Sequence, residues 1–233
     1  MILNVDAGEF DSEPEELAAF ADLLHVACGG HAGDEDSMRR TLHRARTHGC
    51  AVGAHPSYPD REHFGRVAMD LPYDTLDESL RDQVRELVRI AHDEGLRVTS
   101  LKPHGAIYHA ANRDAELADL VAHVARDLCG ARASLVGPAR GELARAAAAL
   151  GLEFLPEGFA DRRYEPDGTL RDRGRADALI GSVAESVAQA NALALRGDVR
   201  TLCVHADSPL ALPILRALRA RFAFDHDLRH RNG

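Results

Sequence analysis

Ionisable side chains stand at the ends of several short apolar runs in this sequence. Asp6 ends the run ILNVD, His55 ends AVGAH, and Lys102 ends VTSLK. Five more residues lie at or just after the ends of such runs, which belong to six of the seven runs in all: His31, His104, Glu157, His205 and Asp207. Carboxylates, imidazoles and an amine can move protons, stabilise an anion or hold a metal ion. Their recurrence at so many run ends predicts one shared site.

The loop PSYPDREHFGR, which follows His55, adds Asp60, Arg61 and Arg66 to this set. A connecting loop needs only one or two turn residues, so this longer polar loop is expected to line the site. A single histidine is more often a packed interior residue than a functional one, but four histidines at four run ends share that explanation poorly. A strand end also holds His55 more rigidly than a loop would, as a reacting group requires.

Two glycine-containing segments carry further candidates. NVDAGE places Asn4 and Glu9 around the end of the first run, where a turn capped by an aspartate is the simpler alternative. CGGHAGDED places His31 in a loop before a helix that Asp34 is expected to cap. The free amides of such a loop and helix start suit a carboxylate or a phosphate.

Lys102 is distinguished by composition as well as by position. The chain has 28 basic side chains, and Lys102 is the one lysine among them. Arginine therefore occupies every other basic position, and a lysine retained at a strand end predicts a role that arginine cannot fill.

Seven apolar runs alternate with amphipathic segments, a pattern typical of repeated β-then-α units and a parallel sheet. The expected strands are Ile2–Asp6, His25–Cys28, Ala51–His55, Val98–Lys102, Ala133–Gly137, Leu152–Pro156 and Thr201–His205. Ser12 and Glu15 have the spacing of a capping box for the first helix. The last helix is expected over about Pro209 to Phe222.

The positions of the ionisable residues favour a closed barrel over an open sheet. A barrel brings all strand ends to one mouth, whereas an open sheet gathers only those near its switch point. We predict an α/β fold, a (β/α) barrel with seven strands, forming a single domain over residues 1–233. The tail from about residue 225 is expected to be frayed, with His226 and His230 outside any metal site.

Composition excludes several classes of partner. The net charge is −9 and no basic block occurs, so nucleic acid is not expected as a partner. The N-terminus lacks the features of a signal peptide, and no run approaches the ~18 apolar residues of a membrane span. The four cysteines lack C-x-x-C spacing, which predicts free buried thiols in a cytoplasmic protein, with Cys28 alone near chemistry.

Common catalytic motifs are also missing from the sequence. Pro103 follows Lys102, so this is not a P-loop lysine, and no G-x-G-x-x-G, G-x-S-x-G or H-E-x-x-H occurs. Any ATP chemistry would therefore need an unusual site or another subunit.

Six motifs of the chain, spread in order from residue 2 to about 210, resemble the LamB/YcsF family closely: LNVDAGE, VACGGHAGD, VGAHPSYPDREHFGR, LKPHGAIYH, EGFADRRYEPDGTL and CVHAD. The chain departs from the family pattern at Phe10, where glycine is usual, at Gly30, where an aromatic is common, and at Ala206, which replaces the glycine of His-Gly-Asp. The connection over residues 197–201 is also shorter.

The resemblance implies a seven-stranded barrel similar to the glycoside hydrolase and polysaccharide deacetylase barrel. It also implies a hydrolase acting on a cyclic amide: one subunit of an ATP-hydrolysing 5-oxoprolinase that opens 5-oxo-L-proline to L-glutamate with B and C subunits. Because no phosphate-binding loop is present, we expect ATP to be bound mainly by those partners. No tightly bound metal ion is expected, because substrate phosphorylation makes a Lewis acid less necessary and compact H-x-x-x-H spacing is absent.

In this hypothesis Asp6 or His55 is the general base, and Lys102 with a loop amide near His31 stabilises the anionic centre. Arg61 or Arg66 would pair with the substrate carboxylate. The expected catalytic residues are Asp6, His55, Lys102 and His104. The expected substrate-binding residues are Asn4, Glu9, His31, Asp34, Asp60, Arg61, Arg66, Glu157, His205 and Asp207.

Two other functions fit the same residues. A stand-alone metal-dependent amidohydrolase or carbohydrate deacetylase would use Asp6, His31 and His55 as ligands around an activated water. A non-catalytic subunit would only hold 5-oxoproline for its partners. The sequence is compatible with a homo-oligomer in each case.

Overall fold

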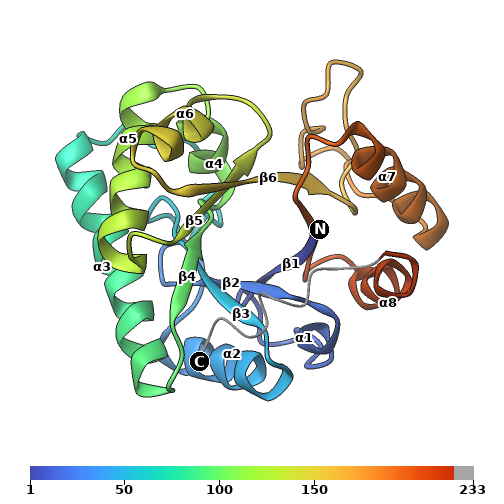
Figure 1. Ribbon diagram of the computed structural model, residues 1–233, viewed down its shortest axis with the longest axis horizontal. Helices are drawn as coiled ribbons and strands as arrows, with labels where there is room; N and C mark the ends of the chain where they lie inside the picture. Colours follow the sequence, from blue (N-terminus) through green and yellow to red (C-terminus); the bar gives the residue numbers. More distant parts are fainter. Residues whose placement is uncertain (223–233) are drawn as a thin grey trace.

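Seven parallel strands close into a barrel in the computed structural model, which describes residues 1–222 (Figure 1). Each strand pairs with its neighbour in sequence, and β7 pairs with β1 to complete the ring. The strands are β1 (Ile2–Ala7), β2 (Leu23–Ala27), β3 (Ala51–His55), β4 (Val98–Leu101), β5 (Ser134–Pro138), β6 (Glu153–Phe159) and β7 (Thr201–His205). The predicted fold class is confirmed. The tail from residue 225, with His226 and His230, lies outside the described residues.

Helices surround the ring and cover the outer face of the strands (Figure 1). They are α1 (Leu17–Phe20), α2 (Glu35–His48), α3 (Tyr73–Asp93), α4 (Gly105–Ala111), α5 (Ala115–Val124), α6 (Glu142–Ala149), α7 (Val183–Arg196) and α8 (Ala211–Arg221), with a π-helical turn at Ala125–Cys129. The outward side chains of the strands, such as Val5, Val26 and Val52, pack against the apolar faces of these helices in one core.

The capping box predicted at Ser12 and Glu15 is wrong. The helix in this segment is only α1, which has no side-chain cap. Glu13 instead accepts hydrogen bonds from three backbone amides of the turn after β1, those of Gly8, Glu9 and Phe10, at 2.9, 2.7 and 3.1 Å. These three amides hold the carboxylate of Glu13 in the turn, so the segment forms a loop in place of a long helix.

The interior of the barrel changes from apolar to ionisable along the strands. Because side chains alternate across a strand, every second residue points inward. The innermost apolar layer consists of Ile2, Leu23, Ala51, Val136 and Leu155. Above it, the Asn4 amide donates to Glu157 Oε1 at 3.0 Å and to Thr201 Oγ1 at 2.7 Å. The next inward positions, towards the C-terminal ends of the strands, include Asp6, His55 and Cys203, and they open the mouth.

A glycine makes room for a histidine in the middle layer. His25 lies between Asn4 Oδ1 and Ser100 Oγ, at 3.3 Å from each. A Cβ atom at Gly53 would lie 2.5 Å from His25 Cδ2 and 2.3 Å from Ser100 Oγ. Any larger residue at position 53 would therefore displace the imidazole ring.

Candidate functional site

A buried lysine joins two carboxylates at the centre of the mouth. Lys102 Nζ lies 2.8 Å from Asp6 Oδ1, 2.9 Å from Glu157 Oε1 and 3.2 Å from the thiol of Cys203. Burial alone would raise the pKa of Asp6, but the charges of His55 and Lys102 outweigh it and hold that pKa well below its ordinary value. Burial likewise opposes the charge on Lys102, yet the negative charge of Asp6 raises its pKa well above the ordinary value. The lysine and Asp6 are therefore both charged near pH 7.

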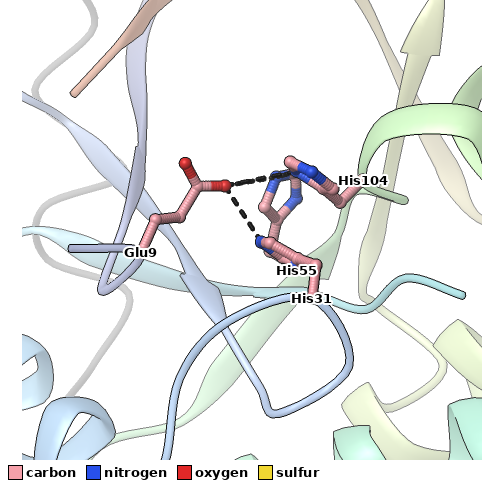
Figure 2. Close-up of side chains that lie close together, drawn as sticks. All are labelled: Glu9, His31, His55 and His104. Atoms are coloured by element: carbon pink, nitrogen blue, oxygen red, sulfur yellow. Dashed lines mark hydrogen bonds and ion pairs between the residues drawn. The ribbon is translucent and has the colours of Figure 1, made fainter. Parts of the chain in front are cut away.

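Beside this pair, one carboxylate faces three imidazoles, a group that we call the Glu9 cluster: Glu9, His31, His55 and His104. Figure 2 shows the Glu9 side chain directed at the rings. Glu9 Oε1 lies 3.0 Å from His31 Nε2, 3.2 Å from His104 Nδ1 and 3.8 Å from His55 Nε2. The rings of His31 and His104 stack with their centroids 3.6 Å apart.

Burial sets the charge of this cluster. It lowers the pKa of His31 to about 3 and also lowers the pKa of His104. Burial would raise the pKa of Glu9, but hydrogen bonds from His104 and His31 hold it well below its ordinary value. A carboxylate therefore faces two neutral rings near pH 7. The third ring differs: burial would lower the pKa of His55, but the charge of Asp6, whose Oδ2 lies 3.4 Å from His55 Nε2, raises it above its ordinary value.

A tight turn in the loop after β3 completes the cluster. Phe64 and Gly65 both have left-handed backbone, with φ of 57° and 63°. This turn presents the Phe64 carbonyl oxygen to His104 Nε2 at 3.0 Å. A Cβ atom at Gly65 would lie 3.0 Å from His31 Cβ and 3.2 Å from His104 Cδ2, so the glycine allows the loop to pack directly on both histidines.

A second histidine–carboxylate pair lies at the rim. Asp161 is fully buried and accepts both the backbone N–H of His205, at 2.8 Å, and its Nδ1–H, at 3.1 Å. Burial would raise the pKa of Asp161, but the charge of His205 lowers it. The ring of Phe159 stacks on His205 with 5.4 Å between centroids, and the His205 side chain stays 12% exposed. When the His205 ring is neutral, with Nδ1–H donating to Asp161, its lone pair is on Nε2, which lies at the opening 3.9 Å from Asp6 Oδ2.

Three arginines and one carboxylate form the outer rim. Asp207 pairs with Arg66, at 3.3 Å, and with Arg173. Arg162 Nη2 donates to the Arg171 carbonyl at 2.7 Å, while its buried Nε has no hydrogen-bond partner among residues 1–222. Burial and the charge of Arg173 lower the pKa of both Arg66 and Arg162. Three guanidinium groups therefore lie close together on this side of the mouth, beside the carboxylates of Asp207 and Asp161.

A pocket of about 630 Å³ opens beside the mouth, and its lining includes Glu157, Phe159 and Tyr164. Tyr108, which also lines it, donates its hydroxyl to Glu157 Oε2 at 3.0 Å. A volume of this size suits a small organic ligand.

Several predicted site residues lie away from the cluster. Asp34 caps α2 by accepting from Ser37 N at 2.8 Å, and Asp60 accepts from His63 N at 3.1 Å. Arg61 is exposed and donates to the Gly33 carbonyl. Asn4 lies one layer below the mouth, where it positions Glu157. The structure brings the other predicted residues to the mouth or its rim.

Sequence reasoning missed several members of the mouth: Tyr108, Asp161, Arg162, Arg173 and Cys203. The alternation of side chains was the signal for Cys203, which precedes His205 by two residues on the same face of β7. The thiol that we expected near chemistry, Cys28, packs instead in the core between barrel and helices, where burial raises its pKa to about 12.

Comparison with known proteins connects this geometry to a family. The LamB/YcsF family profile matches residues 2–227, a range that includes every strand and every side chain of the mouth. The chain belongs to the LamB/YcsF family.

Relatives of this LamB/YcsF chain are similar to it over nearly its whole length. The A subunit of 5-oxoprolinase from Methylococcus capsulatus is 43% identical over 238 residues, covering 95% of this chain and 91% of the relative. The crystal structure of a lactam utilization protein from Thermus thermophilus has a TM-score of 0.85 at 30% identity, covering 95% of this chain and 96% of that one. A proposed cellobiose-phosphate cleavage protein from Enterococcus faecalis, at 11% identity and a TM-score of 0.56, covers 94% and 89% and shares the fold alone.

One of these relatives is named as a subunit of 5-oxoprolinase and another as a lactam utilization protein. Within residues 1–222, no helix is both long and apolar enough to cross a membrane.

Proposed function

We propose that this chain is the A subunit of an ATP-hydrolysing 5-oxoprolinase, which opens 5-oxo-L-proline to L-glutamate together with B and C subunits. The single observation that carries the proposal is the His205–Asp161 pair beside Asp6 and Lys102, at the mouth of a barrel from the LamB/YcsF family. The name of the Methylococcus relative supports the choice of substrate.

The reaction needs one proton acceptor, one proton donor and an activated carbonyl. A partner subunit would transfer phosphate from ATP to the ring oxygen, because this chain has no phosphate-binding loop. Water then adds to the ring carbon, the C–N bond breaks, and the nitrogen leaves as an amine after gaining a proton. A second water releases phosphate and leaves the new carboxylate.

His205 suits the role of general base better than Asp6 or His55. Its Nδ1–H is committed to Asp161, so Nε2 carries the lone pair and faces the opening. The carboxylate of Asp6 is already neutralised by Lys102, which makes it a weak base. His55 is 1% exposed and belongs to the Glu9 cluster, where its Nε2 lies 3.0 Å from His104 Nδ1. A well-placed base contributes ~10²–10⁴-fold to the rate.

The rim arginines suit the anionic part of the substrate. Arg66 is 38% exposed at the side chain and lies over the Phe64 ring, 4.7 Å from its centroid, so the guanidinium is held in place. Arg66 can pair with the carboxylate of 5-oxoproline, whereas the second rim arginine, Arg173, neutralises Asp207. Lys102 acts from below as a fixed charge, since Asp6, Glu157 and Cys203 surround its ammonium group.

A stand-alone metal-dependent hydrolase is the second candidate. The observation in its favour is the Glu9 cluster, whose four ligand atoms lie within 4.8 Å of one another. That function would need no ATP and no partner.

Reconstitution tests these functions. The purified chain is to be assayed for ADP and glutamate formation from ATP and 5-oxoproline, alone and with the products of neighbouring genes. We expect no useful rate from the chain alone and coupled turnover from the complex. Hydrolysis of an amide by the isolated chain without ATP would establish the second candidate. Full turnover by a complex that carries His205→Gln would show that the general base is another residue of the mouth or belongs to a partner subunit.

A further inference from the structure

The Glu9 cluster has the spacing of a metal site. Each of its four residues offers one ligand atom, and these atoms all lie within 4.8 Å of one another. The short contacts within the cluster involve Glu9 Oε1, His31 Nε2, His55 Nε2 and His104 Nδ1. The individual separations given above run from 3.0 to 3.8 Å. With metal–ligand bonds of ~2.1 Å, two ligands of a tetrahedron lie ~3.4 Å apart. The separations of Glu9 Oε1 from the three ring nitrogens, and of His55 Nε2 from His104 Nδ1, therefore lie near the value that a tetrahedral ion requires.

The outer hydrogen bonds determine which ring nitrogens face inward without a proton. His55 Nδ1 lies 2.8 Å from the Lys102 carbonyl oxygen, and His104 Nε2 lies 3.0 Å from that of Phe64. A carbonyl oxygen can only accept, so both of these nitrogens carry the ring proton. If His55 is neutral, its inward Nε2 and His104 Nδ1 are two lone pairs that face each other at 3.0 Å, whereas a protonated His55 Nε2 has both His104 Nδ1 and Asp6 Oδ2, at 3.4 Å, as acceptors.

Two lone pairs at hydrogen-bond distance repel unless a cation or a proton lies between them. A proton on His55 Nε2 would relieve this one contact. It would leave His104 Nδ1 still facing Glu9 Oε1, a second acceptor, at 3.2 Å. A single cation at the centre relieves both contacts at once and binds His31 Nε2 as well.

Rigid elements hold the cluster before any ion binds. Its members follow four consecutive strands, β1 to β4, and their side chains are nearly or fully buried. Glu13 fixes the turn that carries Glu9 by accepting its backbone amide at 2.7 Å. Backbone carbonyls orient two of the rings, as outer partners do for histidines that bind metals.

A second set of three possible metal ligands lies next to the Glu9 cluster. Asp6, Cys203 and His205 also lie within ligand distance of one another. The ammonium of Lys102 already lies 2.8 Å from Asp6 and 3.2 Å from Cys203, so this group has its counter-charge within the chain. The Glu9 cluster has no lysine or arginine in that position among its ion pairs in residues 1–222.

We propose that Glu9, His31, His55 and His104 bind one divalent transition-metal ion, with Zn²⁺ the preferred ion. Three imidazoles and one carboxylate suit zinc and its neighbours in the first row, whereas magnesium and calcium prefer oxygen ligands. The sequence favoured a site without a tightly bound metal because it lacks compact histidine spacing. The geometry replaces that spacing with ligands from four separate strand ends. This inference does not depend on the proposed function, since binding needs neither substrate nor partners.

The experiment uses the full chain without an affinity tag. Protein stripped with a chelator is titrated with Zn²⁺ by calorimetry and with Co²⁺, whose visible absorption reports tetrahedral ligation. Variants Glu9→Gln and His104→Gln each remove one ligand while they keep side-chain size. The matched controls are His43→Gln, an exposed histidine on α2, and the double change His226→Ala with His230→Ala in the tail. Far-ultraviolet circular dichroism verifies the fold of every variant.

We expect one equivalent of Zn²⁺ to bind the wild-type chain and both controls. Each cluster variant should bind at least ~100-fold more weakly and lose the Co²⁺ spectrum. Wild-type binding weaker than ~10 µM would overturn the proposal. So would tight binding that survives both cluster variants, or that disappears with the tail histidines. A complex without 5-oxoproline turnover would refute the proposed function and leave this result unchanged.

Discussion

The ammonium of Lys102 lies 2.8 Å from Oδ1 of Asp6, and both side chains are 3% exposed. Such a pair is weak evidence for stability, because desolvation offsets most of the attraction. Removing one partner is costly, because the other charge is then buried alone. The mouth of the barrel is therefore sensitive to small changes at these two positions.

Replacing Lys102 by arginine should reduce both activity and stability, although arginine occupies every other basic position of the chain. A guanidinium is wider than an ammonium, and the closed space between Asp6 and Glu157 has no room for it, so overpacking should cost ~1–3 kcal/mol. Turnover by the complex should fall at least ~100-fold. Lys102→Met should cost ~3–5 kcal/mol of unfolding free energy, because two carboxylates lose their cation. Urea unfolding and coupled turnover measure both effects. Near-wild-type turnover of the arginine variant would show that any positively charged side chain is sufficient at position 102.

The buried His25 should make stability depend on pH. Burial lowers its pKa well below 6.5, so the unfolded chain binds a proton that the folded chain does not. Its contribution is complete above pH 6.5 and is lost as the pH falls below that value, by ~1.4 kcal/mol per pH unit. In His25→Gln the dependence of the unfolding free energy on pH should be smaller by the contribution of one proton, ~1.4 kcal/mol per pH unit. His43→Gln, at an exposed position, should keep the wild-type slope. Unfolding free energies at pH 7.5, 6.5 and 5.5 give the slopes, and identical slopes for His25→Gln and wild type would contradict the assignment.

Asp161→Asn tests whether His205 must be oriented by Asp161, and not only be present, for turnover. The amide can donate to Nδ1 and so favours the wrong tautomer, with the proton on Nε2. We expect turnover to fall ~10²–10⁴-fold with little change in KM, and His205→Gln to fall as far. Asp82→Asn, at an exposed position on α3 where Asp82 accepts from Arg85, is the control. If the Asp161 variant keeps its rate, the base lies elsewhere in the mouth.

Arg66 and Arg61, two candidates from one loop, should respond differently to removal. Arg66→Ala should raise the KM for 5-oxoproline ~10–100-fold, the loss of one charge-assisted hydrogen bond of ~1.5–3 kcal/mol. Arg61→Ala should leave KM unchanged, because its side chain is exposed and bound to the Gly33 carbonyl. Steady-state kinetics of the reconstituted complex compare the two. The reverse pattern would indicate that Arg61, and not Arg66, binds the substrate carboxylate.

Gly30 should tolerate no side chain in this chain. A Cβ atom there would lie 2.4 Å from both Gln83 Oε1 and Ser57 Oγ. Gln83 is held in place by Ser57, whose amide donates to it at 3.0 Å and whose carbonyl accepts from it at 2.9 Å. Gly30→Ala should therefore lower the free energy of unfolding by ~1–3 kcal/mol, measured in urea. A matched Gly168→Ala change, where a Cβ meets nothing within 4 Å but φ is +86°, reports the cost of backbone strain alone. Unchanged stability of Gly30→Ala would mean that Gln83 moves freely.

The sequence by itself determined the order of the elements and many, but not all, of the residues at the mouth. Its seven apolar runs and their ionisable ends predicted the barrel. The length of a strand, and the side to which each of its side chains points, depend on residues that are close in sequence. Asp6, His55 and Lys102 lie where that reasoning placed them. The capping role of Asp34 was equally local and is present.

The partners of these residues were decided only by the closed ring. Glu9 and His104 are 95 positions apart, and their contact depends on how four strands are staggered around the barrel, which no short pattern encodes. The same holds for the choice between Arg61 and Arg66, since the direction of a loop is set by what it packs against. A single strand specifies which side chains point inward. Only the packing of seven strands around one axis specifies which of those side chains meet.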